Sequence, residues 1–308
     1  MELQSEQQIM ADWESSSPKI SVCCITFNHE KYIEEALHGF LMQQTKVPFE
    51  ILIHDDASTD STQEILKGYQ AKYPNLIFGI YQTENQWSKG VKRINPDFNF
   101  SRAKGKYIAM CEGDDFWTDP FKLQKQYEYL EANPDCSVCF TATTLYQDKN
   151  PEKSEIYRPK KVNVDTIFTI EETIWKPGNF MTTVSMFFRT EYVKQLPEWV
   201  MEAPVGDMPL SLYLGTKGDY GYINDVTCSY RLMASGSWSA NKDFERRRKI
   251  VQGLLKTMRD FNEFTNYKYD KYVKREIRRI KFNDKKSIVK RAIAETSIGA
   301  WLKKKFNL

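Results

Sequence analysis

The sequence lacks the features that mark several large classes of protein. No stretch of its 308 residues approaches the roughly 18 apolar residues that span a bilayer, and the N-terminus has neither the basic nor the apolar region of a signal peptide. There is no internal repeat and no low-complexity segment. We therefore expect a chain on the cytoplasmic side, and its length allows one large domain or one domain with an appendage.

Motifs for zinc, redox chemistry and dinucleotides are also missing. The three histidines do not have metal-ligand spacing, and the lone Cys136-x-x-Cys139 has no second Cys/His pair. Because the residues around that motif continue as a strand, we expect the six cysteines to be buried core thiols. The chain has no Gly-x-Gly-x-x-Gly, and residues 26–30 are not a glycine-rich basic loop. These absences argue against a dinucleotide oxidoreductase and against a nucleotidyltransferase that makes nucleotide sugars.

Charge is divided unevenly along the chain. Residues 267–308 contain 14 Lys and Arg against 4 Asp and Glu, a balance of +10, whereas the whole chain carries +3. The first 266 residues therefore carry −7. An acidic body with a basic tail suggests two tasks, and the acidic body argues against nucleic-acid binding.

Strand-like and helix-like segments alternate through the first half of the chain. This order predicts an α/β fold with a mixed, mostly parallel, Rossmann-like sheet flanked by helices. Residues 1–17 are polar and are expected to be a flexible leader, and the polar, aromatic stretch 82–99 is expected to be a loop over a site. The expected strands are 20–27, 50–54, 76–81, 107–111, 182–189 and 220–230, a short helix is expected at 207–215, and residues 241–308 are expected to be helical.

Two of the expected strands end in clustered carboxylates. Asp55 and Asp56 follow one strand, and Glu112, Asp114 and Asp115 follow another. Like charges at one edge of a sheet repel each other, so such clusters are tolerable mainly where a cation or strong hydrogen-bond donors neutralise them. The carboxyl ends of strands are also where ligands bind to an open α/β sheet. The pattern predicts a site for a metal ion and a nucleotide.

A series of short motifs extends this prediction over residues 18–240. The motifs are residues 21–28 (SVCCITFN), 54–60 (HDDASTD), 103–108 (AKGKYI) and 112–117 (EGDDFW), then Gly206-Asp207, and Tyr230-Arg231 with Gly236-x-Trp238-Ser239. In this order they resemble the motifs of family 2 glycosyltransferases, which are inverting, metal-dependent enzymes with the GT-A fold. Two positions depart from the family pattern. Glu112 is the first acid of the D-x-D motif, and Met233 stands where many relatives have a histidine near the metal or diphosphate.

The resemblance implies a GT-A domain over residues 18–240, with a nucleotide-binding half (18–118), an acceptor-binding half (119–240) and a basic helical C-terminal extension (241–308). It implies Mn²⁺ or Mg²⁺ held by Asp114 and Asp115 against the diphosphate of a nucleotide sugar, with Glu112 facing the ribose or a water on the metal. The residues it implies at the donor site are Thr26, Phe27, Asn28, Asp55, Asp56, Arg102, Lys106, Glu112, Gly113, Asp114, Arg231 and Trp238.

Several of these assignments have a simpler structural alternative. An acceptor-only carboxylate at Asp55 or Asp56 suits the N3–H of uracil, which favours a UDP-sugar, but the pair could merely cap the loop that follows. Arg102, Lys106 and Arg231 suit phosphate oxygens, although solvated surface cations are the alternative. Trp238 could stack on a sugar face or serve the core.

Asp207 is expected to be the general base that takes the proton from the acceptor hydroxyl. Positioned acid–base groups contribute on the order of 10²–10⁴-fold to rates. Because Asp207 precedes Pro209 by two residues, a role as a helix N-cap is the alternative.

The basic tail has two interpretations. A cationic amphipathic helix can lie on an anionic leaflet, which would place the enzyme at the inner face of the plasma membrane beside a lipid-linked acceptor. Alternatively, the tail is a helical pair that packs on the GT-A domain or on a second copy of the chain, as a homo-oligomer.

The function expected from the whole sequence is transfer from a nucleotide sugar to a hydroxyl of a saccharide or lipid-linked saccharide, in the synthesis of a surface polysaccharide or glycoconjugate. The non-enzyme alternative is a sugar-binding or scaffold protein with the same fold. The intact Asp114, Asp115 and Asp207 argue against that alternative.

Overall fold

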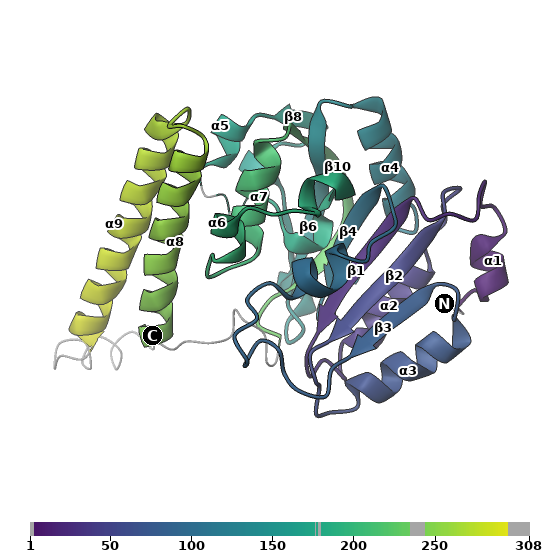
Figure 1. Cartoon of the computed structure of the whole chain (residues 1–308). Coiled ribbons are helices and arrows are strands. Elements are labelled where there is room, and N and C mark those ends of the chain that lie inside the picture. The colour runs from purple at the N-terminus through teal and green to yellow at the C-terminus, as the bar shows by residue number, and fades with distance from the viewer. Residues whose placement is uncertain (1–2, 176, 178–179, 235–243, 295–308) are drawn as a thin grey trace.

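One mixed sheet with helices on both faces organises the molecule (Figure 1). The computed structural model describes residues 3–175, 177, 180–234 and 244–294. The strands are β1 (Ile20–Thr26), β2 (Phe49–Asp55), β3 (Ile77–Tyr81), β4 (Tyr107–Glu112), β5 (Phe116–Trp117), β6 (Cys136–Tyr146), β7 (Glu155–Tyr157), β8 (Thr166–Phe168), β9 (Phe187–Arg189) and β10 (Asp219–Arg231).

Helices and helical turns connect these strands. The α-helices are α1 (Glu6–Met10), α2 (Ile33–Leu41), α3 (Thr62–Lys72), α4 (Lys122–Ala132), α5 (Ile170–Thr173), α6 (Glu198–Met201), α7 (Asp207–Gly215), α8 (Phe244–Phe264) and α9 (Asp270–Ala294). The shorter turns are the π-helical η1 (Asn95–Phe100) and the 3₁₀ turns η2 (Pro151–Lys153), η3 (Pro159–Lys161), η5 (Thr183–Ser185) and η6 (Thr190–Val193).

The strand order brings several strand ends to one edge of the sheet. Within the described residues the order is β3-β2-β1-β4-β9-β6-β10-β5, with β7 beside β6 and β8 beside β10. The strands β3, β2, β1 and β4 are parallel, as predicted. The second half is mixed, because β9 runs antiparallel to both β4 and β6, while β10 is parallel to β6. Since β9 reverses direction between them, β4, β6 and β10 end at the same edge, which we call the rim.

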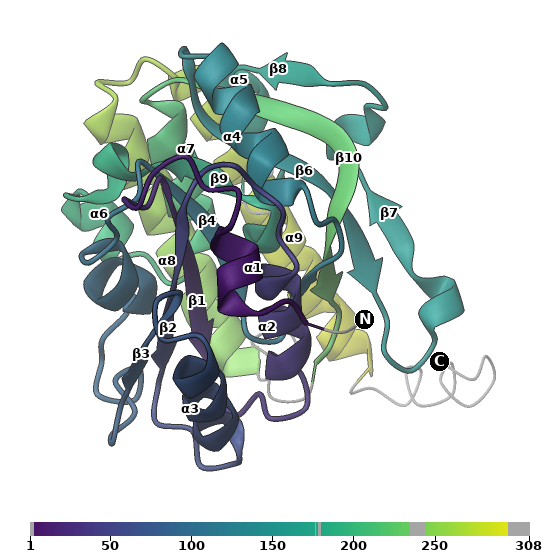
Figure 2. The same ribbon diagram turned by 90° about the vertical axis from the view of Figure 1, so that its right-hand side faces the viewer.

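The rim runs across both halves of the sheet, because β1 and β2 are parallel to β4 and end there too. Figure 2 shows β6, β7, β8 and β10 together on one side, and β1, β2 and β3 on the other. The α/β architecture expected from the sequence is confirmed, and two local predictions were wrong. The stretch expected as a loop ends in η1, and the strand expected at 182–189 is η5 followed by the short β9.

Both faces of the sheet are buried, which explains the nearly continuous apolar strands. In β1, Cys23 belongs to the core on one face, whereas Val22 and Cys24 belong to the core on the other. All six cysteines are buried free thiols, as predicted. Burial raises the pKa of Cys228, so this thiol stays protonated and unreactive.

The N-terminal segment is packed rather than loose, so the flexible leader expected at 1–17 was a wrong prediction for its described part. The capping box formed by Ser5 and Gln8 begins α1, and Ile9 of this helix is buried in the core. The Glu6 carboxylate accepts hydrogen bonds from the backbone and side-chain nitrogens of Asn75, at 2.7 and 2.8 Å. The apolar Ile9 was the signal in the sequence for this docking.

The C-terminal extension is a helical hairpin that packs on the body of the protein. α8 and α9 lie side by side next to α6 and α7 (Figure 1). Leu255, Met258 and Phe261 of α8 enter the core that contains α7, and the guanidinium of Arg275 in α9 lies 4.2 Å from the Trp175 ring centroid. None of the described helices combines the length and the hydropathy needed to cross a bilayer.

Candidate active site

Three carboxylates gather in the loop that follows β4. Glu112 is the last residue of this strand, and Asp114 and Asp115 lie between it and β5. One oxygen from each of the three lies within 4.8 Å of the others. We call residues 112–115 the acidic loop. The sequence-predicted cluster is therefore formed at the rim.

Burial makes this concentration of negative charge costly. Burial, together with the charges of Asp114 and Asp207, raises the pKa of Glu112 to about 8. Burial and the charges of Asp114 and Glu112 also raise the pKa of Asp115, although the backbone N–H of Arg231 opposes this shift. Oδ2 of Asp115 is buried without a hydrogen-bond partner. Unpaired buried carboxylate oxygens in such a group are suited to a hard divalent cation, so the residues present fit Mn²⁺ or Mg²⁺.

Arg231 holds the acidic loop in place. Its backbone N–H donates to Oδ1 of Asp115 at 2.8 Å, and its Nε donates to the carbonyl of Asp114 at 2.9 Å. Its guanidinium forms ion pairs with Glu35 and Asp148. With 4% of its surface exposed, Arg231 supports the acidic loop from β10, so the alternative of a solvated surface cation was wrong. Its predicted contact with phosphate stays a prediction.

Because residue 113 is a glycine, the end of β1 and the loop that follows it can approach the acidic loop closely. A Cβ at this position would lie 2.7 Å from Oγ1 of Thr26 and 2.9 Å from Nδ1 of His29. Both of these atoms are buried without hydrogen-bond partners. Thr26 was predicted at the site, whereas His29 was missed. The position of His29 in the loop that follows β1 was the available signal in the sequence for a place at the site. Burial lowers the pKa of His29, although the charge of Asp114 opposes this shift, so its imidazole is favoured in the neutral form.

Asp207 is the first residue of α7, whose predicted bounds are confirmed. Gly206, not Asp207, occupies the N-cap position, and no side-chain capping hydrogen bond is formed there. Burial raises the pKa of Asp207, while the backbone N–H of Met208 and the charge of Arg93 oppose the shift. The charge of Asp207 in turn contributes to the raised pKa of Glu112.

The two acids after β2 organise neighbouring loops. Asp55 accepts hydrogen bonds from the backbone and hydroxyl of Ser58, and from Nε2 of Gln63 at 2.6 Å. Asp56 accepts the backbone N–H groups of Gln86 and Trp87 at 2.7 and 3.1 Å. Both side chains are buried, so the simpler loop-capping role describes Asp55, and Asp56 fastens the loop that starts after β3.

Of the two predicted site residues that follow β1, Asn28 forms hydrogen bonds within the protein and Phe27 is exposed. Asn28 has a φ of 55°, its backbone N–H donates to Oγ of Ser58 at 2.8 Å, and its Oδ1 accepts the backbone N–H of Thr59 at 2.8 Å. Asn28 thus ties the loops after β1 and β2 together. Phe27 is 43% exposed at the rim, where its ring is available to a ligand.

Two predicted phosphate contacts are contradicted by the structure. The guanidinium of Arg102 donates to the carbonyls of Ile53 at 2.9 Å and Phe78 at 3.0 Å, so it links β2 and β3. Lys106 precedes β4 and pairs with Glu131 at 2.5 Å. It therefore lies at the end of β4 opposite to the acidic loop. Both predictions relied on closeness in the sequence to the acidic loop. An extended strand rises about 3.3 Å per residue, so residues that precede β4 lie far from the loop that follows it.

Two other predictions concern the segment after β10. Trp238 lies outside the described residues. Met233, at the position where many relatives have a histidine, is 54% exposed and has a φ of 59°.

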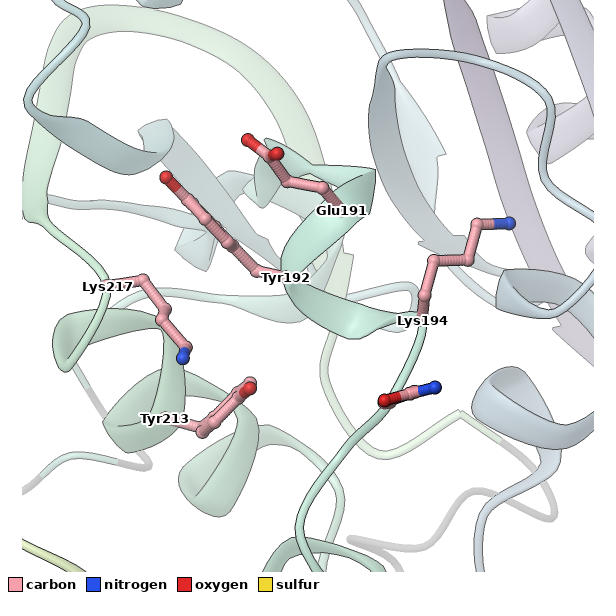
Figure 3. A pocket seen from close by; sticks show the side chains of 6 residues that line it. Glu191, Tyr192, Lys194, Tyr213 and Lys217 are labelled. Atoms are coloured by element: carbon pink, nitrogen blue, oxygen red, sulfur yellow. The ribbon is translucent and has the colours of Figure 1, made fainter.

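A pocket elsewhere in the molecule does not contain the acidic loop. It measures about 300 Å³ and lies between η6 and the C-terminal end of α7 (Figure 3). Nζ of Lys194 donates to the carbonyls of Phe100 and Ala103 at 3.0 and 2.8 Å, and Lys217 lies 5.0 Å from the Tyr213 ring centroid. Its cations are therefore engaged by the protein, and the rim remains the candidate site.

A half-parallel, half-mixed sheet with an acidic loop at its rim defines a glycosyltransferase of the GT-A type. The model of the family described as "Glycosyl transferase family 2" matches residues 21–196. The chain belongs to this family of glycosyltransferases.

Relatives with similar sequences include a named glycosyltransferase. The chain is 32% identical to the putative teichuronic acid biosynthesis glycosyltransferase TuaG of Bacillus subtilis, over 76% of this chain and 87% of that protein. It is 34% identical to an uncharacterized protein of Mycobacterium tuberculosis, over 78% of this chain and 68% of that protein.

Solved structures of more distant sequence share the fold. The mannosyltransferase PcManGT from Pyrobaculum calidifontis, in complex with GDP-Man and Mn²⁺, superposes with a TM-score of 0.59 at 16% identity, covering 97% of this chain and 85% of that one. S. aureus TarS 1–349 in complex with UDP-GlcNAc gives 0.58 at 17% identity, covering 82% and 73%. In its UDP complex the same TarS fragment is covered over 65% of its length.

Proposed function

We propose that this glycosyltransferase moves a sugar from a UDP-sugar to a hydroxyl of a saccharide or lipid-linked saccharide, with inversion, during synthesis of a surface polysaccharide or glycoconjugate. The observation that carries the proposal is the meeting of Glu112, Asp114 and Asp115 at the rim. The named role of TuaG and the nucleotide sugars bound to the structural neighbours support the substrate class.

In this proposal Asp114 and Asp115 hold Mn²⁺ or Mg²⁺, with Glu112 on the ribose side. When bound, the cation supplies Lewis-acid stabilisation of the leaving diphosphate. Exposed Phe27 and buried Thr26 border the place of the nucleoside. These side chains bind and orient the donor so that the face of the sugar opposite the diphosphate is open to the acceptor.

Asp207 is the proposed base. Its carboxylate takes the proton of the acceptor hydroxyl while the hydroxyl oxygen bonds to the anomeric carbon and the bond to the diphosphate breaks. A single displacement of this kind inverts the configuration. The raised pKa of Asp207, caused by burial, strengthens the carboxylate as a base compared with an exposed one.

The donor and the metal can be tested together by thermal unfolding. UDP-glucose, UDP-galactose, UDP-N-acetylglucosamine and GDP-mannose are compared with and without Mn²⁺, because a ligand at a hundred times its Kd adds about 2.7 kcal/mol to the free energy of unfolding. A UDP-sugar should stabilise the protein in an Mn²⁺-dependent manner, and Asp114→Asn should remove this effect. Asp12→Asn, at an exposed carboxylate outside the rim, is the control. Stabilisation that persists in Asp114→Asn would refute the site.

The base is tested by Asp207→Asn. This variant should keep the UDP affinity of the wild type and lose transfer by about 10²–10⁴-fold. A fully active variant would return Asp207 to a structural role in α7.

We also propose that the hairpin brings the enzyme to an anionic membrane at the inner face of the plasma membrane. Residues 244–288 hold 15 Lys and Arg against 6 Asp and Glu. In Figure 1 the start of α8 and the end of α9 lie toward the lower side of the molecule, as do the ends of β1 and β2. Exposed side chains near this end of the hairpin are Arg247, Arg248, Lys249, Lys281, Phe282, Lys285, Lys286 and Ile288.

Charge reversal at the two ends of the hairpin tests this contact. The double variant Lys281→Glu/Lys285→Glu should reduce sedimentation with anionic vesicles at least about tenfold, because each basic residue near such a surface contributes about 1 kcal/mol. Lys268→Glu/Lys271→Glu makes the same charge change at the opposite end and should have a much smaller effect. Equal effects, or binding to neutral vesicles that both variants retain, would refute the oriented contact.

A further inference from the structure

Arg93 forms hydrogen bonds with backbone carbonyls that precede Asp207 in the sequence. It lies between β3 and η1, and 6% of its surface is exposed. Its Nε donates to the carbonyl of Val200 at 2.9 Å, and its Nη2 donates to the carbonyl of Ala203. These contacts join residues more than 100 positions apart in the sequence. One planar side chain thus holds a carbonyl of α6 and a carbonyl of the segment between α6 and α7.

The same guanidinium lies beside the start of α7. A Cβ built on Gly206 would have Nη1 of Arg93 as its neighbour at 3.8 Å. The charged groups that act on Arg93 are Asp207, Glu202 and Asp97. Burial lowers the pKa of Arg93 to about 10, and the charge of Asp207 opposes this shift, so the guanidinium stays a cation at neutral pH.

The loop that carries Arg93 also reaches the nucleotide side of the rim. The backbone N–H groups of Gln86 and Trp87, in the same loop, donate to the carboxylate of Asp56. One end of the loop is therefore fastened beside β2, and the other end holds the segment before Asp207. This loop connects the two halves of the rim through hydrogen bonds.

We propose that Arg93 is a positioning residue for Asp207, because its forked contacts with the carbonyls of Val200 and Ala203 and its place beside Gly206 fix the start of α7. This inference rests on the proposed role of Asp207 as the base. Arg93 does not touch the donor in this assignment. A lysine has one rotatable ammonium and lacks the rigid fork with which Arg93 meets both carbonyls.

The experiment separates positioning from donor binding. Arg93→Gln and Arg93→Lys are compared with Lys92→Gln, which changes an exposed neighbour that pairs with Glu202 on the surface. Donor turnover is followed with the nucleotide sugar, among the four named above, that gives the highest Mn²⁺-dependent rate, and UDP is the binding probe. We expect kcat to fall about 10- to 100-fold in Arg93→Gln, because a small misplacement of a reacting group can cost 10²-fold.

Three further readouts define the expected pattern. UDP affinity should stay within about twofold of the wild type, since hydrogen bonds to the donor are not removed. Arg93→Lys should recover part of the lost kcat, and Lys92→Gln should match the wild type. An unchanged kcat in folded Arg93→Gln would overturn the inference. A loss of UDP affinity equal to the loss of kcat would overturn it as well.

A second variant approaches the same segment from the opposite side. Gly253 of α8 packs against Pro204, and a Cβ at this position would lie 2.6 Å from Cγ of Pro204. If Arg93→Gln does not fold, Gly253→Ala should displace the segment and lower kcat with UDP affinity unchanged. An unchanged kcat in this variant would then count against positioning of Asp207 by its preceding segment.

The outcomes also separate this inference from the proposed function. Inactive Asp207→Asn together with fully active Arg93 variants would overturn the inference alone. Active Asp207→Asn would overturn both the proposed base and the positioning role.

Discussion

The backbone N–H of Arg231 donates to Oδ1 of Asp115 at 2.8 Å. The last residue of β10 thereby holds the acidic loop that follows β4, although the two residues are 116 positions apart. The Arg231 guanidinium lies 4.7 Å from the ring centroid of Tyr32 and 5.1 Å from that of Phe116. Aromatic rings and carboxylates together keep this buried cation in place.

Replacing Arg231 should damage both stability and metal binding. Arg231→Gln removes ion pairs with Glu35 and Asp148 and the hydrogen bond to the Asp114 carbonyl. Because the partner carboxylates are partly exposed, we expect a loss of about 2–3 kcal/mol in the free energy of unfolding rather than the larger cost of a fully buried pair. Urea unfolding measures this loss, and calorimetry with UDP and Mn²⁺ should show weaker binding. Lys31→Gln, at an exposed cation near α2, is the control, and an equal effect of both variants would contradict the assigned role.

The glycine in the acidic loop should be essential for its shape. In Gly113→Ala the new Cβ would collide with Oγ1 of Thr26 and Nδ1 of His29, so the loop must shift away from β1. We expect Mn²⁺-dependent UDP affinity to fall at least about tenfold, since displaced carboxylates lose their common geometry. Gly68→Ala in α3 meets no atom within 4 Å and should stabilise the protein slightly, by about 0.5–1 kcal/mol. An unchanged UDP affinity in Gly113→Ala would contradict the requirement for glycine at this position.

The raised pKa of Glu112 predicts a pH-dependent effect of Mn²⁺. The folded chain binds this proton more tightly than the unfolded chain, so the stability it contributes is present below a pH of 4.5 and is lost as the pH rises through about 8. A cation held nearby by Asp114 and Asp115 favours the ionised form of Glu112, so Mn²⁺ should raise the melting temperature more at about pH 8 than at about pH 5.5. Differential scanning fluorimetry across this range measures both effects.

Glu112→Gln supplies the control for this pH dependence. The amide of the variant does not titrate in this range, so the part of the Mn²⁺ effect that depends on ionisation at position 112 should disappear. An equal gain in melting temperature at both pH values in the wild type would contradict the coupling between proton and metal.

The docked N-terminal segment should contribute measurably to stability. Ile9→Ala removes a side chain that is 5% exposed, and we expect a loss of about 2 kcal/mol in the free energy of unfolding. Gln7→Ala, at an exposed position in the same helix, should change it by less than about 0.5 kcal/mol. Equal stability of the two variants in urea would restore the interpretation of this segment as a loose leader.

The acidic loop was predictable from the sequence because its members are neighbours along the chain. A buried strand that ends in Glu112, Asp114 and Asp115 must place its carboxylates at the edge of a sheet. The bounds of α7 were equally local, since Pro209 and the apolar residues after Asp207 fall within a few turns. The buried thiols followed from apolar strands in the same way.

Roles that depend on distant partners were not predictable. Arg231 and Arg102 both carry a guanidinium. Only the fold decides that Arg231 holds the acidic loop and that Arg102 links β2 and β3. Lys106 is six residues from Glu112, yet the extended backbone carries it to the other end of β4.

The sequence by itself determined the alternation of strands and helices in the first half, the acidic loop and the helical character of the basic tail, because apolar periodicity and local charge act over short distances. Only the tertiary structure decided which cations face the rim, how Arg93 and Arg231 support the carboxylates, and how α1 and α8 dock. Those choices depend on contacts between residues about 70 to 200 positions apart, and no pattern within a short window contains them.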